Sequence, residues 1–134
     1  MTRDYLLKKA EQNEKTGSWA ENNGYFDAAV SKFYYALYQR IIYISKKEGF
    51  YCEPPVTDPH SNTLKIFREN IIGKLEENEK TWIFSLDKLK KCRVNADYKE
   101  DIIADKNEYI LIFKAYYKNI SDVLKKFMPR EDGL

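Results

Sequence analysis

The sequence is poor in the residues that metal centres, disulfide scaffolds and phosphate-binding loops require. Its 134 residues include one histidine, His60, and two cysteines, Cys52 and Cys92, which lie far apart without CxxC spacing. These counts exclude a multi-histidine metal cluster and disfavour a structural zinc site, so we expect no metal ion, no cofactor and two free thiols. A glycine-rich phosphate loop and a GxSxG motif are also missing.

Long apolar runs are absent as well. None reaches the roughly 18–20 residues that a membrane span needs, and the first fifteen residues lack the apolar stretch of a signal peptide. We therefore expect a cytoplasmic protein with no membrane association. The net charge of +2 does not predict strong, sequence-independent nucleic-acid binding through a basic surface, but it leaves room for a local phosphate site.

Aromatic residues, by contrast, are abundant. Eleven tyrosines and seven phenylalanines exceed what a leucine-based core requires, so much aromatic surface must face the core, a partner or a ligand. Only five glycines and four prolines interrupt the chain, and no segment alternates as a strand does. We predict a single all-α domain spanning residues 1–134, with its core between about residues 4 and 128.

Apolar spacings of three and four residues place the helices. We expect helices at about 4–22, 25–48 and 59–76, a fourth capped by Thr81, and a last one from the capping box 105–108 to about 127. The charged run EENEK, residues 76–80, reads as an exposed connection. The last helix is predicted to turn inward an apolar stripe that consists of Tyr109, Phe113, Tyr116, Ile120, Val123 or Leu124, and Phe127.

The second helix is apolar over much of its circumference. Its stripe of Phe26, Val30, Phe33, Leu37, Ile41 and Ile44 is broadened by tyrosines 34, 35, 38 and 43. A helix of this kind is either central in its own fold or in contact with a second chain. We therefore assign Tyr34 and Tyr38 to a dimer or partner interface.

The stretch KKCRVNADYKED, residues 90–101, carries the candidate site. Arginine forms a planar fork that suits a phosphate, and Asn95 could position a phosphate oxygen or a 2′-hydroxyl beside Arg93. We assign Arg93, Asn95 and Asp97 to binding, and Arg93 with Tyr98 to any catalysis. The alternative is an ordinary helix end, in which Arg93 and Asp97 form a surface pair worth only about 0.3–0.5 kcal/mol.

Two other features have simple interpretations. His60 follows Pro59 at a helix start and reads as a surface or first-turn residue. Asp97, Asp101 and Asp105 are spaced by four residues and would share one face of a continuous helix, where they could hold a divalent cation. Asp105 is better used as a helix cap, so we favour no metal there.

Two motifs together resemble the HEPN superfamily, in the prokaryotic branch that has a Y-Y-A helix and a later R-x-x-A-D-Y. The matching residues are Ala29, Tyr34, Tyr35 and Ala36, and then Arg93, Ala96, Asp97 and Tyr98. The resemblance covers about residues 5–127. It implies an antiparallel up-and-down bundle of four to five helices that dimerises.

The resemblance also implies a function. Many members are metal-independent ribonucleases, including toxins paired with a nucleotidyltransferase antitoxin and parts of phage-defence systems, and they place a histidine four to six residues after the arginine. Tyr98 stands at that position here. We therefore expect a homodimeric nucleotide-, RNA- or partner-binding module. The alternatives are an endoribonuclease toxin that uses Arg93, and a purely structural interaction bundle.

Overall fold

Every regular element in the described part of the chain is a helix. The computed structural model describes residues 2–99, 103 and 105–129, and no strand occurs in these residues. The α-helices are α1 (Thr2–Asn22), α2 (Phe26–Glu48), α3 (Pro59–Ile71), α4 (Glu77–Ile83), α5 (Leu86–Tyr98), α6 (Lys106–Tyr109) and α7 (Ala115–Leu124). The prediction of an all-α bundle is confirmed.

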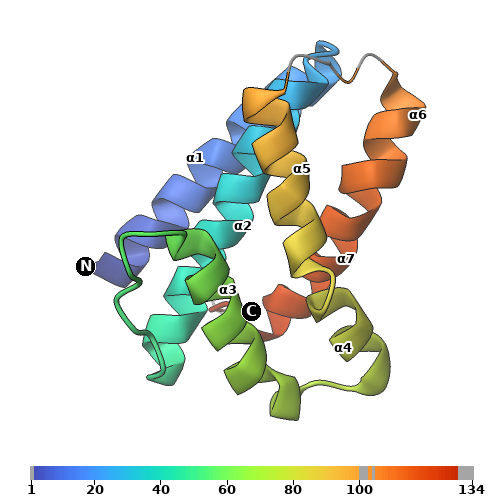
Figure 1. Cartoon of the computed structure of the whole chain (residues 1–134). Coiled ribbons are helices and arrows are strands. Elements are labelled where there is room, and N and C mark those ends of the chain that lie inside the picture. The colour runs from blue at the N-terminus through green and yellow to red at the C-terminus, as the bar shows by residue number, and fades with distance from the viewer. Residues whose placement is uncertain (1, 100–102, 104, 130–134) are drawn as a thin grey trace.

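Helices α1 and α2 form a tight antiparallel hairpin, which is visible at one end of the bundle in Figure 1. The turn needs a left-handed residue, and Gly24 supplies it with φ of 79°. The backbone N–H of Tyr25 then returns to the carbonyl of Ala20 at 2.8 Å. The predicted helix end at Asn22–Gly24 is therefore confirmed.

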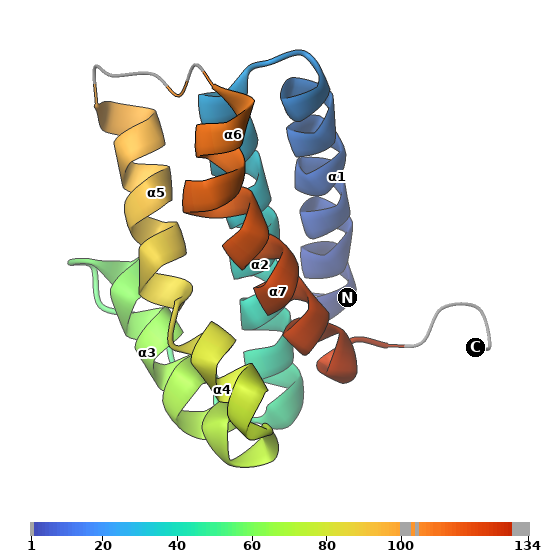
Figure 2. The ribbon, with the colours of Figure 1, turned by 90° about the vertical axis from the view of Figure 1, so that its right-hand side faces the viewer.

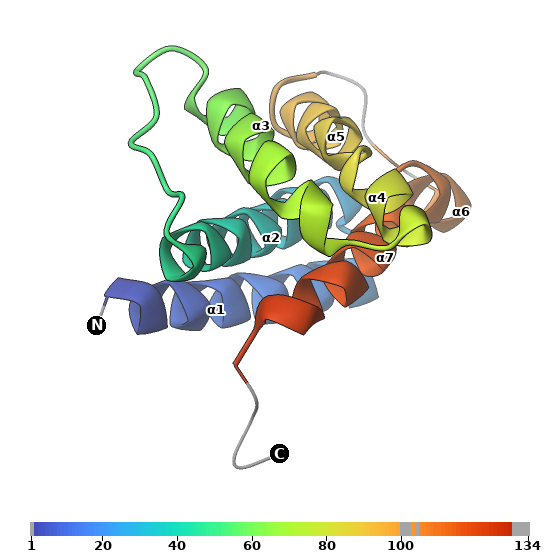
Figure 3. The ribbon, with the colours of Figure 1, turned by 90° about the horizontal axis from the view of Figure 1, so that it is seen from below.

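Helix α2 is the central element of the bundle. It packs against α1 along its length and also contacts α3, α5 and α7. The view from below in Figure 3 shows α3 and α5 on the side of α2 that faces away from α1. This position accounts for the broad apolar circumference of α2, whose buried residues include Val30, Phe33, Tyr34, Leu37, Ile41 and Ile44.

Residues 76–80 are not the connection that was expected but the cap and first turn of a helix, although residues 76–78 are exposed as predicted. Glu76 caps a short helix, because its side chain accepts a bond from the third residue of that helix while Glu79 bonds back to the Glu76 backbone N–H at 2.9 Å. Thr81, predicted as the cap of the next helix, lies inside α4 instead. Helix α5 begins only at Leu86, after a turn at residues 84 and 85.

The last helical segment departs from a regular α-helix at one place. A π-helical stretch, η2 (Ile110–Lys114), lies between α6 and α7 and adds a residue to one turn. Phe113 is buried as predicted, but the next inward residue is Tyr117, which is 4% exposed, rather than Tyr116. Figure 2 shows α6 and α7 as one continuous column beside α2.

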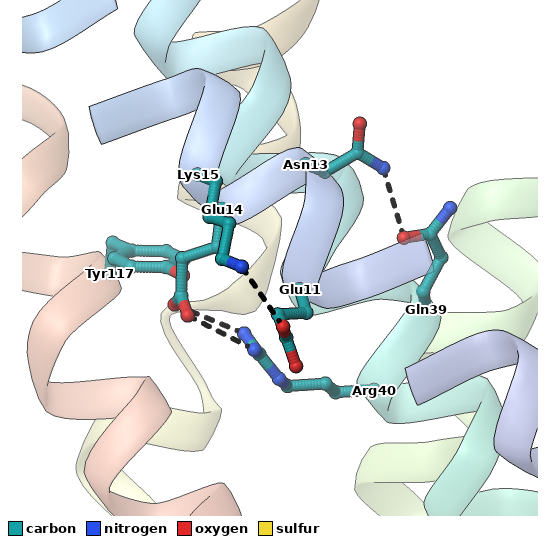
Figure 4. Close-up of polar contacts among 7 residues, drawn as sticks. All are labelled: Glu11, Asn13, Glu14, Lys15, Gln39, Arg40 and Tyr117. Carbon is teal, nitrogen blue, oxygen red and sulfur yellow. Dashed lines mark hydrogen bonds and ion pairs between the residues drawn. The ribbon is translucent and has the colours of Figure 1, made fainter. Parts of the chain in front are cut away.

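Two polar clusters fasten α1 to the rest of the bundle. Glu14 accepts hydrogen bonds from Arg40 of α2 and from Tyr117 of α7, as Figure 4 shows. Two turns further along α1, Glu21 accepts from Tyr109 at 2.7 Å and pairs with Lys114. Both carboxylates thus connect the first helix to the last one.

Among the residues that the structure describes, no helix combines the length and the apolar character that crossing a membrane would require.

Candidate functional site

Arg93 points from α5 into the bundle rather than into solvent. It follows Leu86 and Leu89 on the helix face that packs against α2, and both leucines are buried. Only 8% of Arg93 is exposed. Burying a charged side chain destabilises a fold unless neighbouring groups pair with the charge. The contacts of Arg93 therefore bear directly on its role.

The neighbours compensate the Arg93 guanidinium only in part. Its Cζ atom lies 5.3 Å from the ring centroid of Tyr34 and 5.5 Å from that of Tyr35. Each cation–π contact of this kind contributes roughly 0.5–2 kcal/mol. The Asp97 carboxylate lies 3.5 Å from Nη1, at the limit of a hydrogen bond, and Nε has no partner within the described part of the chain.

His60 is brought into the same cluster by the start of α3. Asp58 adopts a left-handed conformation with φ of 48°, and Pro59 then occupies the first turn of the helix. The Nδ1 atom of His60 lies 2.9 Å from the hydroxyl of Tyr34. Its ring stacks on Tyr38, with 4.1 Å between centroids and 4° between planes.

Lys90 ties the start of α3 to α5. Its Nζ lies 2.9 Å from the carboxylate of Asp58 and also donates to the hydroxyl of Ser61. Asp58 is the N-cap residue of α3, but its side chain forms no cap hydrogen bond, and the carboxylate pairs with Lys90 instead. This bridge fixes the start of α3, which carries His60, against α5, which carries Arg93.

The electrostatics of the cluster favour a neutral histidine. Burial lowers the pKa of His60, and the positive charges of Arg93 and Lys90 lower it further, against a smaller opposing effect of Asp58. Burial likewise raises the pKa of Tyr34, although Arg93 acts in the opposite direction. At neutral pH the site therefore combines two cations, an uncharged imidazole and a protonated phenol.

A hollow on another face of α5 shares Lys90 with this cluster. It has a volume of about 220 Å³ and is lined by Lys90, Lys91, Val94 and Asn95. Its charged lining residues are the two lysines, of which Lys90 is paired with the Asp58 carboxylate. An anion is the ligand that such a lining suits.

The structure brings together some of the residues that the sequence singled out. Arg93 and Asp97 are in contact, and Asn95 lines the hollow beside Lys90. Tyr98 is 75% exposed, and no hydrogen bond joins it to Arg93 in the described residues. Its proposed share in catalysis therefore has no support in the geometry.

The two tyrosines predicted at an interface differ in position. Tyr34 is only 1% exposed, because other residues of its own chain enclose it. Its ring lies against Arg93, and its hydroxyl is hydrogen-bonded to His60. Tyr38 is half-buried, and its hydroxyl donates to Thr63 at 3.2 Å. The assignment of these residues to a dimer or partner interface stays a prediction.

Sequence reasoning missed His60 and Lys90 as members of the site. The expectation of a first-turn position for His60 is confirmed, but that residue is not simply a surface one. One signal was present in the sequence: Tyr34 and Tyr38 lie four residues apart and form an aromatic face that a single histidine could join. Nothing in the sequence showed that α3 would dock there.

No metal centre emerges from the described residues. They contain no group of three or more His, Cys, Asp or Glu side chains placed to hold a cation. The other candidate cation site consists of Asp97, Asp101 and Asp105, and Asp101 lies outside the described residues. Asp105 caps α6, because its carboxylate accepts a hydrogen bond from the backbone N–H of Asn107.

Comparisons with protein-family models, with curated proteins and with solved structures give no match for this chain. The HEPN resemblance therefore rests on its two motifs. In the fold these motifs meet, since Tyr34 and Tyr35 of the first lie against Arg93 of the second.

Proposed function

We propose that this protein is a HEPN-like, dimeric binding module for the phosphate groups of RNA or of a nucleotide, acting in a toxin–antitoxin or phage-defence setting. The observation that carries the proposal is the incompletely paired, buried charge of Arg93 beside His60 and Lys90. A ligand phosphate would complete the pairing through charge-assisted hydrogen bonds.

The hollow beside the cluster supports an anionic ligand over a cationic one. Lys90 and Lys91 line it, and Asn95 adds an amide that can donate to a phosphate oxygen or accept from a ribose hydroxyl. Three cations of α5 could then contact phosphate. For single-stranded RNA this predicts a slope of about −2 in log affinity against log salt concentration.

The test is fluorescence anisotropy with a labelled single-stranded RNA of mixed sequence, with AMP and inorganic phosphate as competitors. Arg93→Met and Lys91→Ala should each weaken RNA binding about tenfold, the loss expected for one charge-assisted contact. Lys15→Ala is the matched control, because Lys15 is an exposed lysine of α1 that pairs only with Glu11. Equal affinity of all three variants for RNA would contradict the proposal.

A second candidate is the endoribonuclease, and the position of His60 favours it. The histidine that the resemblance expects after Arg93 is replaced by Tyr98, yet the fold supplies an imidazole from α3. The test is RNA cleavage in the presence of a metal chelator. Activity that is lost in Arg93→Ala and in His60→Gln would establish the enzyme, and equal activity in all three proteins would exclude it.

The third candidate function, a purely structural interaction bundle, predicts a different set of results. If the bundle only scaffolds a partner protein, Arg93→Ala leaves RNA binding and every other interaction unchanged. A small nucleotidyltransferase encoded beside this gene would favour the toxin–antitoxin setting, and its binding to the purified protein could then be measured directly.

A further inference from the structure

The imidazole of His60 is fixed on two sides. Its Nδ1 is occupied by the Tyr34 hydroxyl at 2.9 Å, and one face of the ring is covered by Tyr38 at 4.1 Å between centroids. Among the described residues no hydrogen bond reaches Nε2, and His60 is half-buried rather than enclosed. The remaining nitrogen is thus the one available to a ligand.

The direction of the Tyr34–His60 hydrogen bond decides what Nε2 can do. Tyr34 is buried and keeps its proton, because burial raises the pKa of its hydroxyl. The Arg93 guanidinium has only donors and lies 5.3 Å from the Tyr34 ring centroid. If Nδ1 donated instead, the hydroxyl proton of Tyr34 would have no acceptor among the described residues, so the hydroxyl is the donor to the histidine.

We propose that Tyr34 holds His60 in the tautomer with its proton on Nε2, so that His60 is a hydrogen-bond donor to a phosphate oxygen of the ligand. The inference rests on the proposed phosphate-binding function and names a residue and an atom for it. It also separates binding from catalysis, since an Nε2 that carries the proton cannot accept one from a ribose hydroxyl.

Ligand binding should then draw a proton into the site. The charged groups that face His60 are Arg93 and Lys90 from α5 and Asp58 from the loop before α3, with the uncharged tyrosines 34, 35 and 38 from α2. A phosphate at Nε2 adds negative charge and raises the pKa of His60 in the complex. The proton that His60 then takes up goes to Nδ1, and the Tyr34 hydroxyl turns from donor to acceptor in their hydrogen bond. Affinity should therefore increase as the pH falls through that raised value.

The tautomer can be measured in the ligand-free protein by ¹⁵N NMR of the imidazole. His60 is the single histidine of the chain, so its two ring nitrogens need no assignment by mutation. We expect a protonated, pyrrole-type Nε2 and an unprotonated, pyridine-type Nδ1. A proton on Nδ1 of the neutral ring would overturn the inference, whether or not the protein binds RNA.

The role in binding is tested with AMP and with the labelled RNA. Tyr34→Phe should weaken both about three- to tenfold, the effect of one lost hydrogen bond, and should reduce the preference for the Nε2 tautomer. Tyr38→Phe is the matched control, because it keeps the stacked ring and loses only the bond to Thr63. Circular dichroism of both variants shows whether the fold is intact.

Proton uptake supplies the last readout. Calorimetric titrations of AMP in two buffers that differ in ionisation enthalpy should show protons taken up on binding, and His60→Gln should remove this uptake. Equal affinities of Tyr34→Phe and Tyr38→Phe would overturn the donor role, whereas binding without proton uptake would show that His60 donates as a neutral imidazole. If the wild type binds neither RNA nor AMP, the proposed function fails together with the donor role, and NMR alone decides the tautomer.

Discussion

Arg40 holds Glu14 through two parallel hydrogen bonds, with both N–O distances at 3.1 Å. Tyr117 donates a third bond to the same carboxylate at 2.7 Å. The three residues come from α2, α1 and α7, so one ionised side chain joins the first, second and last helices of the bundle (Figure 4). Bidentate arginine–carboxylate pairs with low exposure are the ion pairs that contribute to stability.

Arg40→Met should destabilise the protein by about 1–3 kcal/mol. The substitution keeps the apolar stem and removes the cation, so Glu14 is left with Tyr117 alone; the partial exposure of Glu14 keeps the loss below the limit for a fully buried pair. Urea unfolding measures the effect. Lys15→Met, which breaks the exposed Lys15–Glu11 pair, should change stability by less than about 0.5 kcal/mol.

Stability should fall in two steps as the pH is lowered. The folded pKa of His60 lies below its ordinary 6.5, so the unfolded chain takes up a proton first and stability decreases from about pH 6.5 downward. His60→Gln should remove this step in urea unfolding across a pH series. An unchanged profile between pH 7 and 5 in that variant would show that the imidazole is not buried.

The second step belongs to the glutamates of α1. Burial by itself would raise the pKa of Glu14, but the hydrogen bonds from Arg40 and Tyr117 outweigh it and hold the pKa below 4.5. A depressed carboxyl pKa stabilises the fold above the unfolded value, and this stabilisation is lost as the pH falls through the folded value. Glu14→Gln should flatten the profile below about pH 4.5 while leaving the His60 step in place.

Gly17→Ala should destabilise the protein by about 1 kcal/mol, although alanine is the better helix former. A Cβ atom at Gly17 would lie 3.1 Å from the ring of Phe33. That ring cannot easily recede, because Tyr117 and Lys114 lie against it at 4.9 Å and 4.5 Å from its centroid. Thermal unfolding measures the change, and adding Phe33→Leu should recover part of it.

Gly73→Ala is the control for Gly17. Nothing lies within 4 Å of a Cβ atom added there, and the backbone φ of Gly73 is not positive. We expect no loss of stability from this variant. An equal loss at both positions would mean that the loss at Gly17 does not come from the Phe33 ring, because the effect of Gly→Ala on the unfolded chain is stabilising.

We expect the purified protein to be a homodimer, as the HEPN resemblance implies. Multi-angle light scattering at micromolar concentration measures the mass in solution. If Tyr38 lies at the interface, Tyr38→Ala should shift the population toward monomer, whereas Phe84→Ala, which removes a side chain that is 61% exposed on the turn after α4, should not. A monomeric wild type would contradict the expectation.

The helices were largely predictable because the apolar spacing and the turn residues agree along most of the chain. Gly24 and Asp105 end and begin helices as their chemistry requires. The errors have local causes. The run at 76–80 looks polar throughout, yet Glu76 and Glu79 cap each other, and the π-helical stretch moved the inward position from Tyr116 to Tyr117.

Only the part of the site on α5 was predictable from the sequence. Arg93 stood out by its motif, whereas His60 lies 26 residues from its hydrogen-bond partner Tyr34, and local patterns carry no information on such a contact. Its place depends on how the loop after α2 returns α3 to the bundle. The Asp58–Lys90 bridge that fixes this return is formed by two residues that each read as ordinary surface charges.

The α1–α2 hairpin has a consequence for the order of folding. Its contacts join residues that are close in sequence around Gly24, so they cost little loop entropy and can form early. The bond from Tyr117 to Glu14 spans 103 residues and can form only after the whole intervening chain has collapsed. The hairpin should therefore gain hydrogen-exchange protection before the last helix does, and the last helix should exchange through smaller openings of the native state.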